Sequence, residues 1–250
     1  MTAAPAQPQP ATPPTPRTVL VSGASRGIGR AIAERLLTDG HRVSAGVRDP
    51  ASLAGLCGQE RDRLLIQPYE ASAGDGDPRG PRAWVEATAE RWGGIDAVVH
   101  CAGVFSRVGL RFADGEEDEI ARVLDVNLMG PWRLSRAAWP LLAASGDGRV
   151  LTLVSMSGKR VKGRLAAYGV SKFALLALCQ AMRNEGWEDG IRVTAICPSW
   201  VNTDMAAAVT AMPHEAMTQP QDLAASVSHL LELPSAAVPF EFSVNCQLET

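Results

Sequence analysis

A tyrosine and a lysine stand four residues apart in the sequence, at Tyr168 and Lys172. On a helix this spacing places both side chains on one face, so the lysine cation lies near the phenol. A free phenol has a pKa near 10, and a neighbouring positive charge favours the phenolate and lowers that pKa. With two tyrosines and three lysines in the chain, chance alone would produce this spacing about 0.02 times. The pair is therefore suited to exchanging a proton with the oxygen of a carbonyl or an alcohol.

Two further polar residues could join this pair. Ser155 ends a short apolar run, and its hydroxyl could hydrogen-bond a substrate oxygen. Ser157 is a rival for that role, and a serine can also simply end a strand. Asn127 lies within a helical pattern, where asparagine is unfavourable unless its side chain is satisfied. A bound water that connects Asn127 to Lys172 would satisfy the amide and relay protons, and a plain buried amide is the alternative.

A glycine-rich turn with the spacing Gly-x3-Gly-x-Gly follows the first apolar run, from Ser22 to Gly29. Glycines there let the chain turn sharply and let a pyrophosphate approach backbone N–H groups at the start of a helix. The spacing differs from the general dinucleotide fingerprint, and no Lys-Ser/Thr follows it as in a Walker loop. A merely tight connection is the alternative, but the position after the first strand favours nucleotide binding. The candidate cofactor contacts in this turn are Gly23, Ser25, Arg26, Gly27, Ile28 and Gly29.

The residues after the second apolar run bear on which dinucleotide binds. An NAD site generally offers a carboxylate there to the ribose hydroxyls, but Val47 stands at that position and Arg48 follows it. Arg48 and Arg26 together could hold a 2′-phosphate, so we predict NADP rather than NAD. Asp49 argues for NAD, since a one-residue shift would place it at the acid position. Both arginines could also be solvated surface residues.

The elements that must position these residues alternate along the chain. Short apolar runs predict strands, and longer segments with helical spacing separate them. The predicted strands are Thr18–Ser22, Arg42–Ala45, Leu64–Ile66, Ala97–His100, Val150–Val154 and Arg192–Ile196, with Phe240–Val244 as an edge strand. The predicted helices are Ile28–Thr38, Pro81–Arg91, Glu116–Ala144, Ala167–Glu185 and Pro220–Leu231. This order predicts an α/β fold with a doubly wound, mostly parallel sheet and helices on both faces.

Composition excludes several classes of function. The 250 residues carry a net charge of −3, which provides no overall basic field for nucleic acid. No apolar run approaches the ~20 residues of a membrane helix, and no secretory h-region is present. Five cysteines without paired spacing argue against a disulfide scaffold or a zinc site, so we expect a cytoplasmic protein without a metal. The Pro/Ala-rich composition of residues 1–16 predicts a disordered tail, and we expect residues 17–250 to form a single domain.

The combination of motifs resembles the short-chain dehydrogenase/reductase family from Thr18 to about Val244. The resemblance rests on the turn at residues 22–29, Asn127, Ser155, the Tyr168–Lys172 spacing and the segment 197–203 (Cys-Pro-Ser-Trp-Val-Asn-Thr). It implies a seven-stranded Rossmann-like sheet and a catalytic set of four residues, with assembly as a homodimer or homotetramer. The implied catalytic set is Asn127, Ser155, Tyr168 and Lys172.

The same resemblance implies further contacts to the nicotinamide cofactor. In addition to the glycine turn and Arg48, the implied cofactor contacts are Ala102, Gly103, Asn127, Tyr168, Lys172, Pro198, Val201 and Thr203. In this set Lys172 would contact the nicotinamide ribose, and Val201 and Thr203 would hold the carboxamide.

Three segments depart from the family pattern. Residues 100–103 read His-Cys-Ala-Gly instead of Asn-Asn-Ala-Gly. His100 could be a second acid–base group, but we predict a hydrogen-bonded histidine at a strand end. Ser199 replaces the glycine of the usual Pro-Gly, and residues 244–247 lack the customary glycine pair.

The residues between Ser155 and Tyr168 bear on the substrate. Four cations lie in six residues, at Lys159, Arg160, Lys162 and Arg164. In this family's fold the loop rims the substrate cleft, so we hypothesise an anionic substrate, such as a keto acid or an acyl group on a phosphorylated carrier. A solvated basic loop or an oligomer surface is the alternative.

A methionine-containing stretch follows the sixth predicted strand. Residues 204–218 would form a lid over the substrate or pack onto the body of the domain. The candidate substrate contacts are Ser155, Ser157, Tyr168, Trp200 and Met205.

These residues together predict an NADP-dependent carbonyl reductase or alcohol dehydrogenase, which transfers hydride between nicotinamide and a ketone or secondary alcohol. Two alternatives stay open. One is a non-catalytic dinucleotide-binding regulator on the same fold, and the other is an epimerase or dehydratase that uses the same tyrosine. A regulator would need only the glycine turn, so the presence of all four polar residues of the catalytic set argues against it.

Overall fold

The computed structural model describes residues 15–56, 61–207 and 212–247, so most of the predicted N-terminal tail lies outside the described residues. Within these ranges seven strands form one sheet in the order β3-β2-β1-β4-β5-β6-β7, and every neighbouring pair is parallel. The strands are β1 (Thr18–Ser22), β2 (Arg42–Val47), β3 (Leu64–Pro68), β4 (Ala97–His100), β5 (Arg149–Leu153), β6 (Arg192–Pro198) and β7 (Glu241–Val244). All seven predicted strands, including the edge strand, are confirmed.

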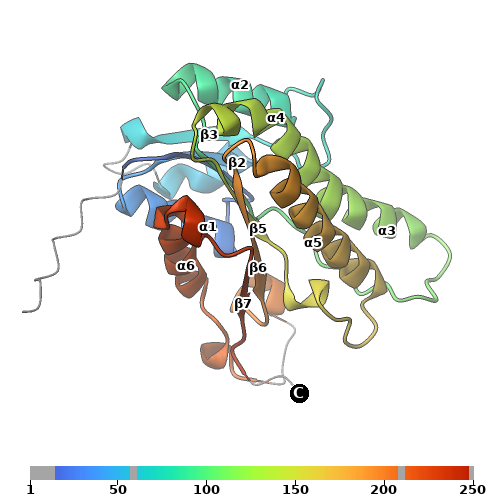
Figure 1. Ribbon diagram of the computed structural model, residues 1–250. Coiled ribbons are helices and arrows are strands. Elements are labelled where there is room, and N and C mark those ends of the chain that lie inside the picture. Colours follow the sequence, from blue (N-terminus) through green and yellow to red (C-terminus); the bar gives the residue numbers. More distant parts are fainter. Residues whose placement is uncertain (1–14, 57–60, 208–211, 248–250) are drawn as a thin grey trace, which may run out of the picture.

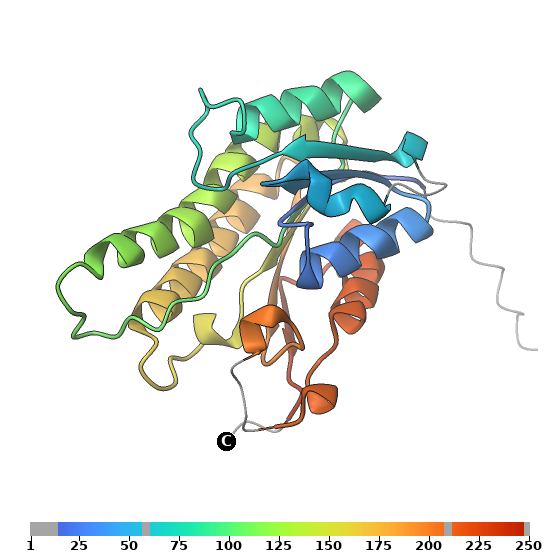
Figure 2. The ribbon, with the colours of Figure 1, turned by 180° about the vertical axis from the view of Figure 1, so that it is seen from behind.

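Helices cover both faces of this sheet, as predicted. The α-helices of the described residues are α1 (Gly27–Thr38), α2 (Pro81–Trp92), α3 (Glu117–Leu124), α4 (Gly130–Ala144), α5 (Ala166–Gly186) and α6 (Pro220–Glu232). Figures 1 and 2 show α1 and α6 on one face and α2, α4 and α5 on the other. Successive residues of β1 supply both cores, since Val19 and Val21 pack on the side of α1 and α6 while Leu20 packs on the opposite side. No helix of the described segments has the length and apolar character needed to span a bilayer.

The predicted helix Glu116–Ala144 differs in one respect from the structure. The helical run begins at Glu117 and is interrupted by a π-helical turn at Asp125–Met129, which separates α3 from α4. The N–H of Gly130 reaches back five residues to the carbonyl of Asp125. A Cβ at Gly130 would lie 2.9 Å from the Ala71 carbonyl oxygen, so the helix passes close to the loop after β3 there. The π-helical turn has a direct consequence for the site, because it carries Asn127.

The sheet has a switch point between β1 and β4. From β1 the chain continues outward to β2 and β3, whereas from β4 it continues in the opposite direction to β5, β6 and β7. In open α/β sheets ligands bind at the carboxyl ends of the strands beside such a point. The segments that leave those ends here are the glycine turn at residues 22–29 and the loop 101–116.

Candidate active site

A cleft of about 500 Å³ opens at the carboxyl ends of the strands. This volume is typical of small-molecule sites. Its walls come from the segments that follow β1, β4, β5 and β6, together with the first turns of α5. Of the four residues in the predicted catalytic set, Ser155, Tyr168 and Lys172 line it directly, and Asn127 lies behind the wall formed by Gly103 and Val104.

The glycine turn packs directly against the loop after β4. Gly23 has a φ of +67°, and a Cβ added to it would lie 2.8 Å from the backbone N of Ala102. A Cβ on Gly29 would lie 2.4 Å from the Gly23 carbonyl oxygen. Only glycine therefore fits these positions. Among the described residues no side chain caps the start of α1, so its first N–H groups are available to a phosphate. These features fit the pyrophosphate of a dinucleotide.

The loop after β4 is held at both ends by side chains. The Ser22 hydroxyl accepts hydrogen bonds from the N–H groups of Cys101 and Ala102, each at 3.1 Å. The Asn127 amide oxygen accepts one from the Val104 N–H at 2.8 Å, and its nitrogen donates to the Val104 carbonyl at 2.9 Å. This part of the cleft wall is thus fixed by hydrogen bonds from two directions.

Asn127 is fully buried, and protein groups satisfy both ends of its amide. Besides the Val104 contacts, its nitrogen donates to the Ser171 hydroxyl at 3.0 Å. A Cβ at Gly103 would lie 3.4 Å from the Asn127 amide oxygen and 3.9 Å from Lys172 Nζ, so Gly103 lies between these two groups. This arrangement matches the prediction of a buried amide; the water relay stays a prediction.

Ser171 is a residue that the sequence interpretation missed. Its hydroxyl is completely buried, donates to the Tyr168 carbonyl at 2.7 Å and accepts from Asn127. It therefore joins the π-helical turn to the first turns of α5. Its position directly before Lys172 was the available signal, but a serine on a helix usually only bonds back to its own turn.

The phenol and the ammonium lie close together, as the four-residue spacing predicts. Lys172 Nζ is 5.7 Å from the centroid of the Tyr168 ring and donates to the Leu153 carbonyl at 3.0 Å. The Phe105 ring packs edge-on against Tyr168 with centroids 5.0 Å apart. Tyr168 and Lys172 are only 8% and 6% exposed, and both line the cleft.

Burial controls the pKa values of this pair. Desolvation raises the pKa of Tyr168, and its hydrogen bond with the Ser155 side chain opposes that increase. Desolvation lowers the pKa of Lys172 to about 8. The sequence interpretation expected the lysine cation to lower the phenol pKa. In the structure burial is the largest cause and the pKa rises, because a nearly enclosed phenolate loses its hydration.

Ser155 has a strained backbone at the end of β5. Its φ of +146° and ψ of 157° lie in a region that is essentially restricted to glycine. Its hydroxyl oxygen accepts a hydrogen bond from the Ser157 N–H at 3.0 Å, and the same side chain is hydrogen-bonded to the Tyr168 phenol. Ser157, the rival candidate, thus contacts Ser155 through its backbone, and both residues line the cleft.

The three charged residues expected near the adenosine end of the cofactor, Arg26, Arg48 and Asp49, are exposed, and each has different surroundings. Arg26 forms an ion pair with Asp204 at 3.1 Å, a partner that the sequence interpretation did not anticipate. Arg48 is exposed directly after β2. The Asp49 side chain accepts a hydrogen bond from the Ala51 N–H at 3.0 Å and so takes part in the start of the 3₁₀ turn at Pro50–Leu56.

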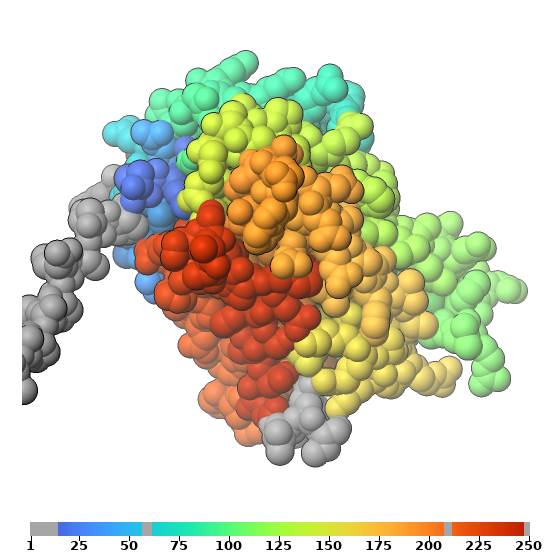
Figure 3. Space-filling model, in the orientation of Figure 1, coloured from blue at the N-terminus to red at the C-terminus, as the bar shows by residue number. Residues whose placement is uncertain are grey.

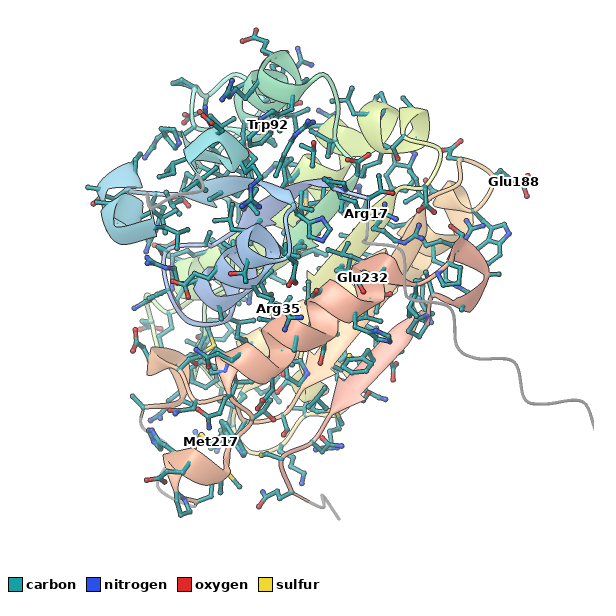
Figure 4. The ribbon with its side chains drawn as sticks, turned by 90° about the vertical axis from the view of Figure 1, so that its left-hand side faces the viewer. Arg17, Arg35, Trp92, Glu188, Met217 and Glu232 are labelled. Atoms are coloured by element: carbon teal, nitrogen blue, oxygen red, sulfur yellow. The ribbon has the colours of Figure 1, made fainter. Side chains whose placement is uncertain are left out.

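The segment after β6 forms the remaining wall. Pro198, Val201, Thr203, Trp200 and Met205 all line the cleft. Of the methionines in the predicted lid, Met205 is about half exposed, whereas Met217 is buried in the body of the domain. Figure 4 shows Met217 near the start of α6 and Glu232 near its end. Residues 208–211 of this stretch lie outside the described residues.

His100 is buried at the end of β4, and its Nε2 lies 2.8 Å from the Ser135 hydroxyl. Burial lowers the pKa of His100 to about 3, so the ring is neutral at physiological pH. Its side chain does not line the cleft in the described part of the chain. The prediction of a hydrogen-bonded histidine at a strand end is confirmed, and a second acid–base group is not supported.

The chain is similar to known oxidoreductases. Agropine synthesis reductase from Rhizobium rhizogenes is 35% identical over 232 residues, which make up 93% of this chain and 53% of that protein. A second agropine synthesis reductase is covered over 52% of its length, so the chain spans about half the length of these two relatives. Oxidoreductase UcpA from Escherichia coli strain K12 is 30% identical over 91% of this chain and 84% of its own length.

The fold is likewise similar to solved structures. The alcohol dehydrogenase from the archaeon Thermococcus sibiricus, complexed with 5-hydroxy-NADP, superimposes with a TM-score of 0.81 at 26% sequence identity, over 92% of this chain and 96% of that chain. The sequence profile of the family described as short chain dehydrogenase matches residues 17–214. The chain therefore belongs to the short-chain dehydrogenase family of NAD(P)-dependent oxidoreductases.

Proposed function

We propose that this protein is an NADPH-dependent carbonyl reductase, which also catalyses the reverse oxidation of a secondary alcohol. The observation that carries the proposal is the convergence of Ser155, Tyr168 and Lys172 on one cleft beside the glycine turn. The name of the agropine synthesis reductases, of which the chain spans about half, supports a reductase. The assembly of all four residues of the predicted catalytic set argues against a purely regulatory protein.

The bound cofactor would supply the hydride for the carbonyl carbon. Ser155, oriented by the Ser157 N–H, donates a hydrogen bond to the carbonyl oxygen. Tyr168 donates its proton to that oxygen as negative charge develops on it. Burial raises the pKa of the phenol and so favours the protonated form that this step needs. Lys172 would hold the nicotinamide ribose, and its positive charge stabilises the phenolate that remains.

We assign Asn127 a role in holding the cleft wall in place. Its contacts to Val104 and Ser171 fix the wall relative to the turn of α5 that carries Tyr168. A water bound to this group and to Lys172 would return a proton to the phenolate, which is the relay predicted from the sequence. Gly103, between Asn127 and Lys172, leaves the space that such a relay needs.

We propose NADP as the preferred cofactor. Two arginines, Arg26 and Arg48, are exposed near the expected adenosine site, and Asp49 is engaged in the backbone turn that follows. A carboxylate that caps its own chain is less available to ribose hydroxyls. The similar alcohol dehydrogenase of Thermococcus sibiricus was solved with 5-hydroxy-NADP. Faster turnover with NADH than with NADPH would contradict this assignment.

We further propose an acidic substrate, a keto acid or an acyl group on a phosphorylated carrier, because of the four cations between β5 and α5.

We also propose that the protein assembles as a homodimer or homotetramer. Large apolar side chains are exposed on two neighbouring helices, at Trp132 of α4 and at Val170 and Phe173 of α5. Burying them between copies would remove apolar surface from water. Sedimentation of the purified chain tests this assembly.

The test of the reaction is label transfer. NADPH carrying deuterium at the transferable position is incubated with a panel of ketones and keto acids, and the products are analysed by mass spectrometry. We expect loss of NADPH absorbance together with one deuterium on the new alcohol carbon. Conversion of a substrate without net loss of NADPH would indicate an epimerase or dehydratase instead. Tight NADPH binding without conversion of any carbonyl would indicate a regulator.

A further inference from the structure

Every charged side chain that lines the cleft in the described part of the chain is positive. Among the described lining residues there is no aspartate or glutamate, and the charged ones are Arg160, Lys162 and Lys172. Lys172 belongs to the catalytic group, whereas Arg160 and Lys162 come from the loop between β5 and α5. A cleft with low-dielectric walls and charges of one sign concentrates ligands of the opposite sign.

Two contacts fix the direction of this loop. Lys159 donates to the Glu241 carboxylate of β7, and this contact lowers the pKa of Glu241. Figure 3 shows the yellow segment after β5 and the red segment of β7 beside one another at the surface. Val161 packs against α5, since a Cβ added to Gly169 would lie 2.8 Å from a Val161 methyl group. Lys159 is thereby tied to β7, and Val161 contacts α5 while half of the residue stays exposed.

Arg164 is directed elsewhere as well. Its Cβ and Nε lie 3.9 Å from the position that a Cβ on Gly109 would occupy, so its side chain runs along the loop 101–116. Lys159 and Arg164 do not line the cleft, whereas Arg160 and Lys162 do. The four cations that look equivalent in the sequence are therefore divided into two that face the cleft and two that face other parts of the protein.

We infer that Arg160 and Lys162 bind an oxyanion of the substrate and thereby select carbonyl compounds that carry an acidic group. Because both cations line the same 500 Å³ cleft as Tyr168, the acidic group and the carbonyl belong to one small molecule. This favours a keto acid over an acyl chain on a carrier. The inference rests on the proposed function and deepens it by choosing the keto acid from the two proposed acidic substrates and by naming the two specificity-determining residues.

The experiment compares an acid with its neutral counterpart. Keto acids, their methyl esters and the matching ketone phosphates are reduced with NADPH by the wild type, by the double variant Arg160→Gln/Lys162→Gln and by Arg164→Gln. In the double variant we expect kcat/KM for the acid to fall about 10- to 100-fold, through KM, while the ester is unaffected. Arg164→Gln, the matched control, should change neither. The better substrate of the acid and the phosphate identifies the oxyanion.

Three outcomes would overturn the inference. They are an equal loss for acid and ester in the double variant, a wild type that reduces ester and acid equally well, and a weakened affinity for NADPH in the double variant. In each case reduction of a neutral ketone would still support the proposed function. Absence of NADPH oxidation with every carbonyl compound contradicts the proposed function itself, so the two failures are distinguishable.

Discussion

Asn127, Tyr168 and Lys172 of the proposed catalytic group are buried, whereas Arg26 and its partner Asp204, beside the glycine turn, expose 72% and 76% of their side chains. The buried groups have fixed hydrogen-bond partners, and displacing any of them leaves a polar atom unsatisfied, at a cost of about 1–3 kcal/mol. An exposed ion pair contributes little and can be exchanged for a ligand. On the proposed function, we therefore expect the reaction to depend on fixed geometry and the choice between NADPH and NADH to depend on charges that can change partners.

Removing the phenol hydroxyl should cause the largest loss of activity in the proposed catalytic group. In Tyr168→Phe we expect kcat to fall about 10²- to 10⁴-fold, since the proton donor is lost. The affinity for NADPH should change little, because the ring still packs against Phe105. Steady-state kinetics and a fluorescence titration with NADPH measure both quantities. Tyr69→Phe, which alters the tyrosine that packs against Trp84, is the control and should be active. Near wild-type activity in Tyr168→Phe would contradict the assignment.

Neutralising the exposed arginines tests whether they select NADPH over NADH. Arg48→Gln and Arg26→Gln should each raise the KM for NADPH about 10-fold and leave the KM for NADH unchanged, because only NADPH carries the 2′-phosphate. Arg42→Gln, at the exposed opposite end of β2, serves as the control. The two cofactors are compared in parallel with one carbonyl substrate. Equal changes with NADPH and NADH would show that the arginines do not contact the 2′-phosphate.

The strained backbone at Ser155 predicts a smaller effect, on stability, in which glycine is the more stable substitution. Ser155→Gly and Ser155→Ala both remove the hydroxyl and should reduce activity, but glycine adopts the positive φ without strain. We expect the free energy of unfolding of the glycine variant to exceed that of the alanine variant by about 1–2 kcal/mol, as measured by urea unfolding. At Ser157, inside a 3₁₀ turn, the same pair of substitutions should show the reverse order. If glycine is the less stable variant at Ser155 too, the backbone there is not strained.

The acid sensitivity of the fold should depend on His100. Its pKa is about 3 in the folded protein and near 6.5 when unfolded, so between these values the unfolded chain takes up a proton that the folded chain does not. Stability therefore falls as the pH decreases from about 6.5 toward 3. In His100→Gln the loss of urea midpoint between neutral pH and about pH 4.5 should shrink. His229→Gln, on the exposed side of α6, should leave that loss unchanged. An unchanged loss in His100→Gln would contradict the role of burial.

The strands and the motifs at their ends were predictable because they depend on local patterns. Apolar runs identified all seven strands, and the four-residue spacing placed Tyr168 and Lys172 on one face of α5. The π-helical turn was not predictable, since it is stabilised by the contacts of Asn127 with distant residues. A helical pattern records only which residues are apolar, not where the hydrogen-bond pattern widens.

The directions of side chains in irregular segments could not be predicted from the sequence either. The cations from Lys159 to Arg164 occupy a loop without a period, so only the contacts to β7, α5 and the loop 101–116 separate them. The ion pair of Arg26 with Asp204 joins residues 178 positions apart. The direction of the Tyr168 pKa shift likewise depended on burial, which spacing alone does not reveal.

The widened turn at Asp125–Met129 also constrains how the length of this chain can vary. A π-helical turn holds about one residue more than an α-helical turn, so removing a single residue there would restore regular α-helical bonding and leave the direction of α4 nearly unchanged. The side chains from Gly130 to Ala144 would keep their faces, whereas Asn127 would lose the backbone position from which it reaches Val104 and Ser171. Single-residue deletions in this stretch are therefore expected to leave the core intact and to release the cleft wall, although they would improve the helix when considered by itself.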